Sequence, residues 1–421
     1  MLLEFSVSNY LSFRDKKTLC LEPTSITDFK DNCIENGRYS GLKSIVLYGA
    51  NASGKSNLIK AMSVMKEIIR TSTRNSSTDE INVTPFLLNA QNQNQPSFFE
   101  IVFIYESVKY RYGFEVDKKS VQYEWLFETT AKTEKELFLR TPDGIEVKSA
   151  FKEGKGLEER TRDNALFLPI VDQFNGQISK KIMLWLNNWN TISGLSHEQY
   201  RTITFNLFEK DDALKEFIKR LDLGIKDLKL KKVLFDSEKL KTNIPEDLVK
   251  QIITDLQGKT IVEILAEHDV LNENGEVIGQ IDFDLRSQES SGTNKIFDIS
   301  GPIFDTIKNG GILVIDELDA KLHPLMTNSI VNLFNSKALN PKNAQLIFAT
   351  HNTNLLSNGK FRRDQIYFLE KDNFNSTDLY SLIEYKEGNA KVRKDRSFEK
   401  DYINGKYGAI PFIGDFNELF K

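Results

Sequence analysis

The sequence predicts an α/β fold that combines a mixed sheet with an antiparallel β lobe and an inserted, mostly helical subdomain. After residue 290, helical patterns alternate with short apolar runs, which is typical of a parallel α/β sheet. Between residues 98 and 140, segments with alternating apolar and polar residues are joined by short turns, which predicts antiparallel strands. From about residue 151 the sequence becomes rich in charge and then helical in its spacing, so a separate insert is expected there.

The N-terminal lobe is expected to span residues 1–150. Residues 44–48, SIVLY, form a short apolar run that stops at a glycine, as expected of a buried strand. Residues 58–69 carry apolar side chains at helical spacing. The other strands of this lobe are predicted at 3–7, 18–21, 98–105, 110–116, 123–130 and 135–140.

The insert is expected at 151–255 and the C-terminal lobe at 256–421. In the insert, residues 178–189 and 211–221 have amphipathic helical spacing. In the C-terminal lobe, an Asn-Glu-Asn-Gly turn predicts a hairpin between two strands. Strands are predicted there at 260–267, 277–285, 311–315, 344–349, 366–369 and 379–383, and helices at 295–308 and 325–333.

The composition excludes several classes of protein. The 421 residues include 56 basic and 60 acidic side chains, which is not the charge balance of a chain that binds nucleic acid over its whole surface. Lysines crowd between residues 215 and 241, but acidic residues dilute them, and a solvated surface is the favoured interpretation. Cys20 and Cys33 are the two cysteines, which suits a reducing cytoplasm. Four histidines leave little material for a zinc cluster, and no apolar run is long enough for a membrane span.

The strongest motif is a phosphate-binding loop. Residues 49–56, GANASGKS, match the pattern G-x-x-x-x-G-K-[ST] between the predicted strand and helix. In such a loop, backbone N–H groups and the helix N-terminus surround phosphate. Lys55 is expected to reach the β- and γ-phosphates, and the Ser56 hydroxyl is expected to bind Mg²⁺. The expected nucleotide-binding residues are Gly49, Ala50, Asn51, Ala52, Ser53, Gly54, Lys55, Ser56 and Asn57.

Two later strands end in residues that suit the same chemistry. The run 311–315 is followed by Asp316 and Glu317. Asp316 is expected to hold Mg²⁺, and Glu317 to act as general base on an attacking water. The run 344–349 is followed by Thr350 and His351. We expect His351 to contact the γ-phosphate, although a lone histidine at a strand end is often only a polar cap.

Ser290 and Gly292 stand just before a predicted helix, in the order Ser-x-Gly. A serine and a glycine at a helix N-terminus can bind an anion through the hydroxyl, the backbone N–H groups and the helix dipole. They can equally form an ordinary helix cap without a ligand. Taken alone, the second interpretation is the stronger one.

Together these motifs resemble the ATP-binding-cassette (ABC-type) ATPases, in the branch that contains SMC, RecF and OLD proteins. The resemblance implies a P-loop ATPase that uses ATP and Mg²⁺ and works as a homodimer or a higher homo-oligomer with composite sites. Ser290 and Gly292 would then contact the γ-phosphate bound to a second subunit. Leu318 and Asp319 look like the segment that crosses the dimer interface, and His351 looks like the switch histidine. The family's Q-loop glutamine has three candidates here, Gln91, Gln93 and Gln95.

The sequence is more similar still to the stand-alone ATPases of bacterial anti-phage defence, the RloA, AbiL and AriA kind. The stretches that carry this similarity are 9–13 (NYLSF), 48–57, 291–293, 315–319, 322–324 and 349–352. It implies a cytoplasmic subunit without a membrane segment, whose ATP-driven dimerisation senses a trigger and controls a separate effector, such as a TOPRIM-like nuclease. No Asp-x-Asp follows His351, so nuclease chemistry is expected from another chain. The alternative is a RecF/SMC-like DNA-repair ATPase that binds DNA directly, and nucleic-acid binding stays open.

Overall fold

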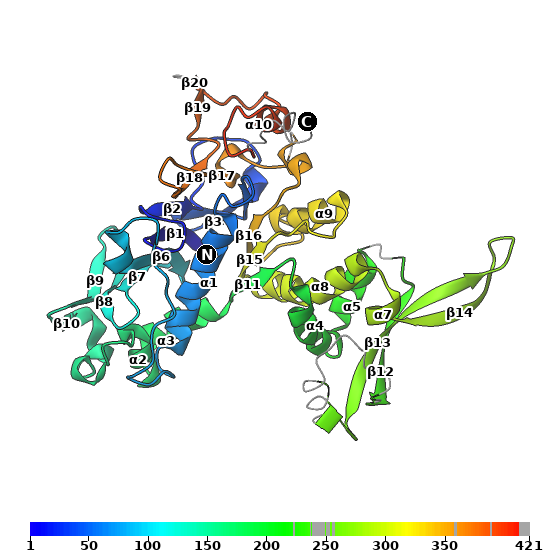
Figure 1. Ribbon diagram of the computed structural model, residues 1–421, viewed down its shortest axis with the longest axis horizontal. Coiled ribbons are helices and arrows are strands. Elements are labelled where there is room, and N and C mark those ends of the chain that lie inside the picture. Colours follow the sequence, from blue (N-terminus) through cyan, green and yellow to red (C-terminus); the bar gives the residue numbers. More distant parts are fainter. Residues whose placement is uncertain are drawn as a thin grey trace, which may run out of the picture. The chain divides into compact units, whose positions relative to one another are not determined.

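The computed structural model describes residues 1–221, 224–235, 257–357, 360–387 and 390–411, together with positions 237, 249, 253 and 254 (Figure 1). The chain divides into two compact units. The first unit comprises Met1–Leu195, Asp305–Ala320 and Pro324–Lys421, and the second comprises Ser196–Phe304 and Lys321–His323.

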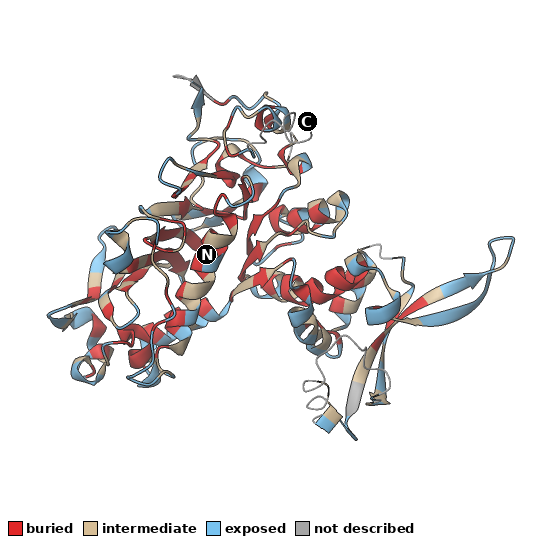
Figure 2. Ribbon diagram, in the orientation of Figure 1, coloured by how far each residue is buried: buried red, intermediate tan, exposed pale blue. Residues whose placement is uncertain are grey.

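The first unit contains a six-stranded sheet in the order β11-β15-β16-β5-β17-β18. All neighbouring pairs are parallel except β17 and β18, so the predicted mixed sheet is confirmed. The central strands are buried, which explains why they appear in the sequence as continuous apolar runs (Figure 2). The strands are β5 (Ser44–Tyr48), β11 (Trp189–Ser193), β15 (Ile312–Asp316), β16 (Gln345–Ala349), β17 (Ile366–Lys371) and β18 (Thr377–Ser381).

A seven-stranded antiparallel sheet forms the rest of the first unit's framework, which confirms the predicted β lobe. Its order is β10-β9-β8-β7-β6-β1-β2. One hydrophobic cluster joins Phe5 of this sheet, Leu47 of the mixed sheet and Met62 of helix α1 (Lys55–Thr71). The helix therefore packs against a core that both sheets share. The strands are β1 (Leu2–Ser8), β2 (Lys17–Cys20), β6 (Ser97–Tyr105), β7 (Val108–Val116), β8 (Val121–Thr129), β9 (Lys135–Thr141) and β10 (Gly144–Val147).

The remaining elements of the first unit are short. The helices are α2 (Phe167–Gln173), α3 (Gln177–Asn187), α9 (Pro324–Asn335) and α10 (Phe398–Ile403), and the strand pairs are β3 (Cys33–Asn36) with β4 (Tyr39–Leu42) and β19 (Lys386–Glu387) with β20 (Ala390–Lys391). The 3-10 helices are η1 (Lys30–Asn32), η2 (Asn92–Asn94), η3 (Ser149–Gly154), η4 (Glu158–Arg160), η7 (Thr353–Leu356) and η8 (Arg363–Gln365).

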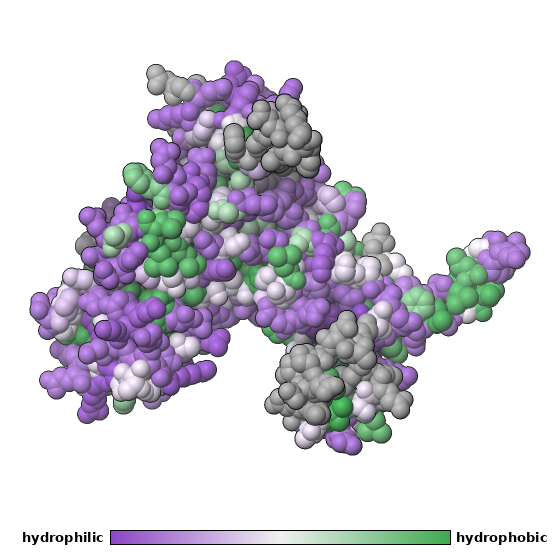
Figure 3. Space-filling model, viewed as in Figure 1, coloured by the Kyte–Doolittle hydropathy of each residue, from purple (hydrophilic) through white to green (hydrophobic). Residues whose placement is uncertain are grey.

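The second unit contains helices and a three-stranded sheet in the order β12-β13-β14. The β13–β14 hairpin ends in the predicted Asn-Glu-Asn-Gly turn, and its apolar side chains, such as Ile278 at 65% exposure, give a hydrophobic stretch along the hairpin (Figure 3). The elements are η5 (His197–Tyr200), α4 (Arg201–Phe208), α5 (Asp212–Lys219), β12 (Asp227–Leu234), β13 (Thr260–Leu271), β14 (Val277–Asp284), α7 (Leu285–Gln288) and α8 (Ser291–Asn309), whose last residues belong to the first unit.

These units are divided at positions other than the expected domain boundaries of 1–150, 151–255 and 256–421. Residues 151–195 belong to the first unit, because aromatic side chains hold α3 on the antiparallel sheet and residues 189–193 form β11 of the mixed sheet. The rings of Phe103 on β6 and Trp185 on α3 stack with centroids 3.8 Å apart. The expected end of the insert, at residue 255, lies outside the described residues. Among the described residues, no helix combines the length and apolarity that a membrane crossing requires.

Candidate functional site

Three parallel strands bring the predicted site residues to one edge of the mixed sheet. The register pairs Ile315 with Phe348 and Ala349 with Leu47. The loop after β5, the acidic pair at the end of β15 and the Thr-His pair after β16 therefore lie at the carboxyl ends of three adjacent strands. In open α/β sheets this edge is where ligands bind.

The loop at residues 49–54 needs its glycines. A Cβ atom at Gly49 would lie 2.4 Å from the carbonyl oxygen of Leu369. Gly54 has φ +116°, and a Cβ atom there would lie 2.2 Å from Thr377 Oγ1. Other residue types at these positions would collide with β17 or β18, and Gly54 also adopts a backbone conformation that L side chains rarely adopt. The loop is thus packed closely on the sheet, with α1 beginning at Lys55.

Lys55 is buried, with 7% of its surface exposed. Its Nζ donates hydrogen bonds to the carbonyl oxygens of Gly49, at 2.7 Å, and Ala50, at 3.0 Å. Burial lowers the pKa of Lys55, and the carboxylates of Asp316, Glu317 and Asp319 oppose that shift. A desolvated ammonium group held by two neutral carbonyls gains from an anionic partner, since hydrogen bonds between charged groups are stronger.

A chain of hydroxyl groups supports the loop from the neighbouring strand. Thr377 Oγ1 donates to the carbonyl oxygen of Ser53 at 2.9 Å and lies 2.8 Å from Ser12 Oγ. Asn57 Nδ2 donates to the same Ser12 Oγ at 2.8 Å. Asn57 is one of the expected nucleotide-binding residues and Ser12 lies in the stretch 9–13 (NYLSF), whereas Thr377 has no local signal in the sequence.

The acidic pair lies at the end of β15, against the end of β11. The N–H of Gly194 donates to the carbonyl oxygen of Asp316 at 2.7 Å, and a Cβ atom at Gly194 would lie 2.0 Å from the carbonyl oxygen of Glu317. Glu317 has φ +53°, an uncommon backbone conformation for this residue type. Such conformations concentrate at functional sites.

The buried polar atoms of this site fit a magnesium-bound phosphate. Within the described part of the chain, Asp316 Oδ1 and Ser53 Oγ are buried without a hydrogen-bond partner. A carboxylate oxygen without a hydrogen-bond partner suits a hard cation such as Mg²⁺, and a hydroxyl without a partner suits an anion such as phosphate. Among the described residues, no group of three or more His, Cys, Asp and Glu side chains could hold a metal by itself. Mg²⁺ at nucleotide sites is usually bound by one or two side chains together with phosphate oxygens and water.

His351 is exposed, and its backbone N–H lies 3.2 Å from Oδ2 and 3.3 Å from Oδ1 of Asp319. The end of β16 is also fixed from β5, because the Tyr48 hydroxyl donates to the carbonyl oxygen of Asn352 at 2.8 Å. Burial raises the pKa of Tyr48, which keeps this donor protonated. The structure therefore brings His351 and Asp319 together beside the loop that carries Lys55.

Ser290 and Gly292 lie in the second unit. Ser290 Oγ accepts the N–H of Thr293 at 3.1 Å and so caps α8, as the helix-cap interpretation predicts. A Cβ atom at Gly292 would lie 2.9 Å from the carbonyl oxygen of Lys321. Ser290 is nevertheless exposed, so its cap does not bury the hydroxyl. A role for these residues in anion binding stays a prediction.

The three candidate glutamines are all exposed around η2. Gln93 Nε2 donates to the carbonyl oxygen of Leu87 at 2.8 Å, and the N–H of Gln91 donates to Asn89 Oδ1 at 2.8 Å. Neither contact distinguishes a metal-binding glutamine, and the choice between Gln91, Gln93 and Gln95 stays open.

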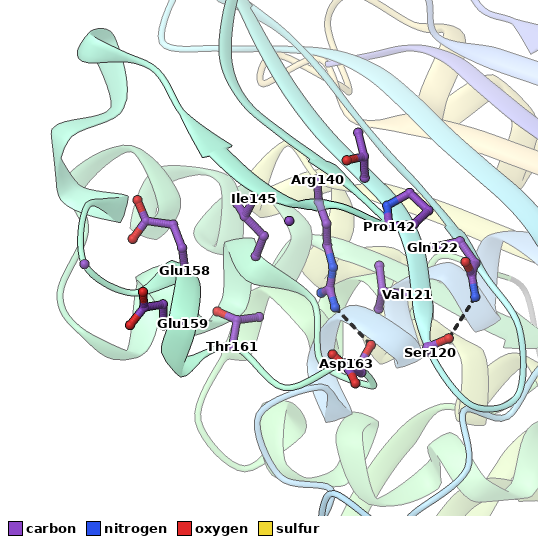
Figure 4. A pocket seen from close by; sticks show the side chains of 13 residues that line it. Ser120, Val121, Gln122, Arg140, Pro142, Ile145, Glu158, Glu159, Thr161 and Asp163 are labelled. Atoms are coloured by element: carbon purple, nitrogen blue, oxygen red, sulfur yellow. Dashed lines mark hydrogen bonds between the residues drawn. The ribbon is translucent and has the colours of Figure 1, made fainter.

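A pocket of about 880 Å³ lies elsewhere in the first unit, along β8, β9 and the segment that includes η4 (Figure 4). Its buried Arg140 donates to the carbonyl oxygens of Ala165, at 2.7 Å, and Asp163, at 3.1 Å. Glu158 and Glu159 line the same pocket. An arginine already bonded to carbonyls, beside two carboxylates, does not suit phosphate, so the sheet edge remains the candidate site.

Comparisons with known proteins give one matching family and two remotely similar solved structures. A family model described as "AAA domain, putative AbiEii toxin, Type IV TA system" matches residues 44–357. A solved SMC head domain from Thermotoga maritima is 13% identical, with a TM-score of 0.40, covering 90% of this chain and 98% of that one. A structure of the recombination mediator RecF with ATP, of the RecFOR pathway, is 13% identical, with a TM-score of 0.31, covering 83% and 93%. No curated protein matches the sequence.

Proposed function

The chain belongs to the AAA-domain family whose model matches residues 44–357, and from this premise we propose that it binds and hydrolyses ATP with Mg²⁺. The observation that carries the proposal is the meeting of Lys55, Asp316, Glu317 and His351 at one edge of the mixed sheet. The carboxylates near Lys55 supply the metal ligand and base that a phosphate loop alone lacks.

Each residue at the edge has a separate role. Lys55 exchanges its two carbonyl partners for the β- and γ-phosphates, and the N–H groups of residues 49–57 bind the same phosphates. Ser56 and Asp316 hold Mg²⁺, which when bound neutralises charge on the phosphate oxygens. Glu317 accepts a proton from the attacking water, and His351 orients the γ-phosphate.

The site is completed by a second copy of the chain. Ser290 caps a helix of 19 residues whose first turn contains Gly292, and this turn can bind the γ-phosphate through the Ser290 hydroxyl, N–H groups and the helix dipole. Two chains then share two nucleotides across an isologous interface, as a homodimer or a larger ring built from dimers.

The biological role that we propose is control of a separate effector in bacterial anti-phage defence, with a TOPRIM-like nuclease as one candidate effector. The family description names a toxin–antitoxin system, and this supports a defence role. The free thiols of Cys20 and Cys33 suit a reducing cytoplasm.

The alternative is a RecF/SMC-like ATPase that binds DNA directly. Its basic surface would have to come from the lysines between residues 215 and 241, of which Lys239 and Lys241 lie outside the described residues. The others are largely neutralised. Five of them lie within 4 Å of a carboxylate in the pairs Lys215–Asp212, Lys219–Asp227, Lys226–Asp269, Lys229–Asp282 and Lys232–Glu209. This pairing favours the effector hypothesis, since phosphate contacts need available cations.

One experiment separates the two functions. Mg²⁺-dependent ATP hydrolysis by the purified chain is measured with and without double-stranded DNA. We expect hydrolysis in both conditions with no stimulation by DNA, and co-purification of an effector from the native operon. Strong DNA stimulation of the chain alone would favour the repair function, and absence of hydrolysis in every condition would contradict both.

A further inference from the structure

A buried ion-pair network connects helix α4 with helix α8 in the second unit. Asp298 on α8 is fully buried, and its Oδ1 accepts a hydrogen bond from Arg201 Nε at 2.7 Å. His197 Nδ1 lies 2.7 Å from Asp298 Oδ2, and Arg201 Nη2 lies 3.2 Å from the same oxygen. The guanidinium group thus binds the carboxylate with two of its nitrogens, which fixes its orientation.

The same guanidinium group reaches the turn that contains Ser290. Arg201 Nη2 donates to Asn294 Oδ1 at 2.7 Å. The other end of this amide, Asn294 Nδ2, donates to the carbonyl oxygens of Leu285, at 2.7 Å, and Ser290, at 3.1 Å. Arg201 therefore selects the orientation in which the Asn294 amide presents its NH₂ group to the chain just before α8.

Helix α4 also supplies a hydrogen bond that α8 cannot make within itself. Pro302 lies inside the helix and has no N–H to donate to the carbonyl oxygen of Asp298. Thr204 Oγ1 donates to that oxygen at 2.7 Å and accepts the N–H of Gly301 at 3.0 Å. A Cβ atom at Gly301 would lie 2.5 Å from Thr204 Cα, so glycine permits this close approach. Helix α4 thereby fixes the position of α8 along its axis.

We infer that Arg201 is a positioning residue for the Ser290–Gly292 turn and sets the geometry in which this turn meets a phosphate. Stability alone does not account for the network, because a buried ion pair is often no more stabilising than apolar residues of similar volume. Fixed geometry does account for it, since one planar group aligns Asp298 and Asn294 at once. The inference rests on the proposed function only in taking the γ-phosphate of a partner subunit as the ligand.

The first test needs no enzyme activity. In Arg201→Ala without nucleotide, we expect faster amide hydrogen exchange in the peptide that covers residues 286–294 and unchanged exchange in the phosphate loop. Arg220→Ala, which removes an exposed arginine from the same unit, is the matched control and should leave both peptides unchanged. Unchanged exchange at 286–294 in Arg201→Ala overturns the inference, whatever the protein hydrolyses.

The second test determines whether Arg201 acts on the half of the composite site that contains the Ser290–Gly292 turn or on the half that contains the phosphate loop. Arg201→Ala should lower ATP turnover on the order of 10²-fold, the loss that a displacement of about 1 Å at a reacting group can cause. Mixing it with Lys55→Ala chains should restore activity, because one site of the mixed dimer then has an intact loop and an intact turn. Mixing it with Ser290→Arg chains should restore none, since every site then lacks a working turn.

The outcomes distinguish this inference from the proposed function. If Lys55→Ala and Ser290→Arg do not restore activity to each other, the shared site is wrong, and the exchange experiment alone decides on Arg201. If they do, and Arg201→Ala retains wild-type turnover or fails to restore activity with Lys55→Ala, the inference is overturned. Should Arg201→Ala not fold, Arg201→Lys keeps a cation beside Asp298 without the planar fork, and it should show the same pattern in weaker form.

Discussion

The Thr377 hydroxyl lies 2.9 Å from the carbonyl oxygen of Ser53, although 324 positions separate the two residues in the sequence. Thr377 begins β18, one of the two edge strands of the mixed sheet, and Ser53 is part of the phosphate loop. Because this hydroxyl also lies 2.8 Å from Ser12 Oγ, one side chain connects the loop, the edge strand and the N-terminal segment. The loop is therefore held by tertiary contacts as well as by its glycines.

Replacing Thr377 by valine should weaken ATP binding without unfolding the protein. The side chain keeps its shape but leaves the buried carbonyl of Ser53 without its donor, which costs about 1–3 kcal/mol. If ATP binding becomes less favourable by the low end of this range, about 1 kcal/mol, the dissociation constant for ATP rises about fivefold. Titration of a fluorescent ATP analogue measures it. Thr18→Val, which removes a hydroxyl pair with Ser6 on the antiparallel sheet, is the control and should bind ATP normally.

Lys55→Ala should abolish nucleotide binding, because the variant lacks the cation that neutralises the β- and γ-phosphates. Calorimetric titration with ATP and Mg²⁺ checks this, and a thermal melt confirms folding. Lys60→Ala removes an exposed lysine from the same helix and should bind like the wild type. Normal binding by Lys55→Ala would mean that the phosphate loop is placed wrongly.

Glu317→Gln should separate binding from hydrolysis. Glutamine keeps the shape of the side chain but cannot accept a proton from water. We expect normal ATP binding and a loss of turnover on the order of 10²–10⁴, the usual contribution of general acid–base catalysis. Steady-state phosphate release is the measurement, with the exposed Glu80→Gln as control. Unchanged turnover would remove Glu317 from the role of base.

Lys66 on α1 should make stability depend on pH. Its Nζ donates to the carbonyl oxygen of Trp189, and burial, with a smaller effect of Arg70, lowers its pKa to about 8 from the ordinary value of 10.5. Between these two values the unfolded chain binds a proton here that the folded chain does not, so stability rises with pH. Denaturant titrations between about pH 7 and pH 10 should show this rise in the wild type. In Lys66→Met the rise should be smaller, and equal slopes would contradict the assignment.

The sequence predicts five of the six strands of the mixed sheet, because each of the five has a local signal. It misses β11 (Trp189–Ser193), whose first residue is expected at the end of a helix. The run at Ser44–Tyr48 is wholly apolar and ends at Gly49, and its five residues are all buried. The acidic pair after Ile315 ends another such run, and it is identified as a site through the phosphate loop elsewhere in the sequence, since an acidic pair alone is more often a surface pair. Local pattern is sufficient here because a parallel sheet buries both faces of its central strands.

Contacts between distant segments cannot be predicted in this way. Thr377 carries no local signal, and its role depends on how β18 lies against the loop. The lysines of β12 alternate with leucines, but composition alone does not show that Lys229 pairs with Asp282 of β14. Residues 178–189 have helical spacing, but the spacing does not show that Trp185 stacks on Phe103 and places α3 on the antiparallel sheet. Tertiary packing decides each of these cases.

The central claim, an ATP site shared between two chains, is tested most directly by mixing two inactive variants. Lys55→Ala lacks a working phosphate loop, and Ser290→Arg places a bulky cation in the exposed turn. In a mixed dimer one site carries both changes and the other carries neither. With random exchange of subunits in an equimolar mixture, about a quarter of all sites are intact. We predict that each variant alone is inactive and that hydrolysis returns to about this fraction of the wild-type rate on mixing. Wild-type hydrolysis by Ser290→Arg alone, or no recovery on mixing although subunits exchange, would contradict a shared site.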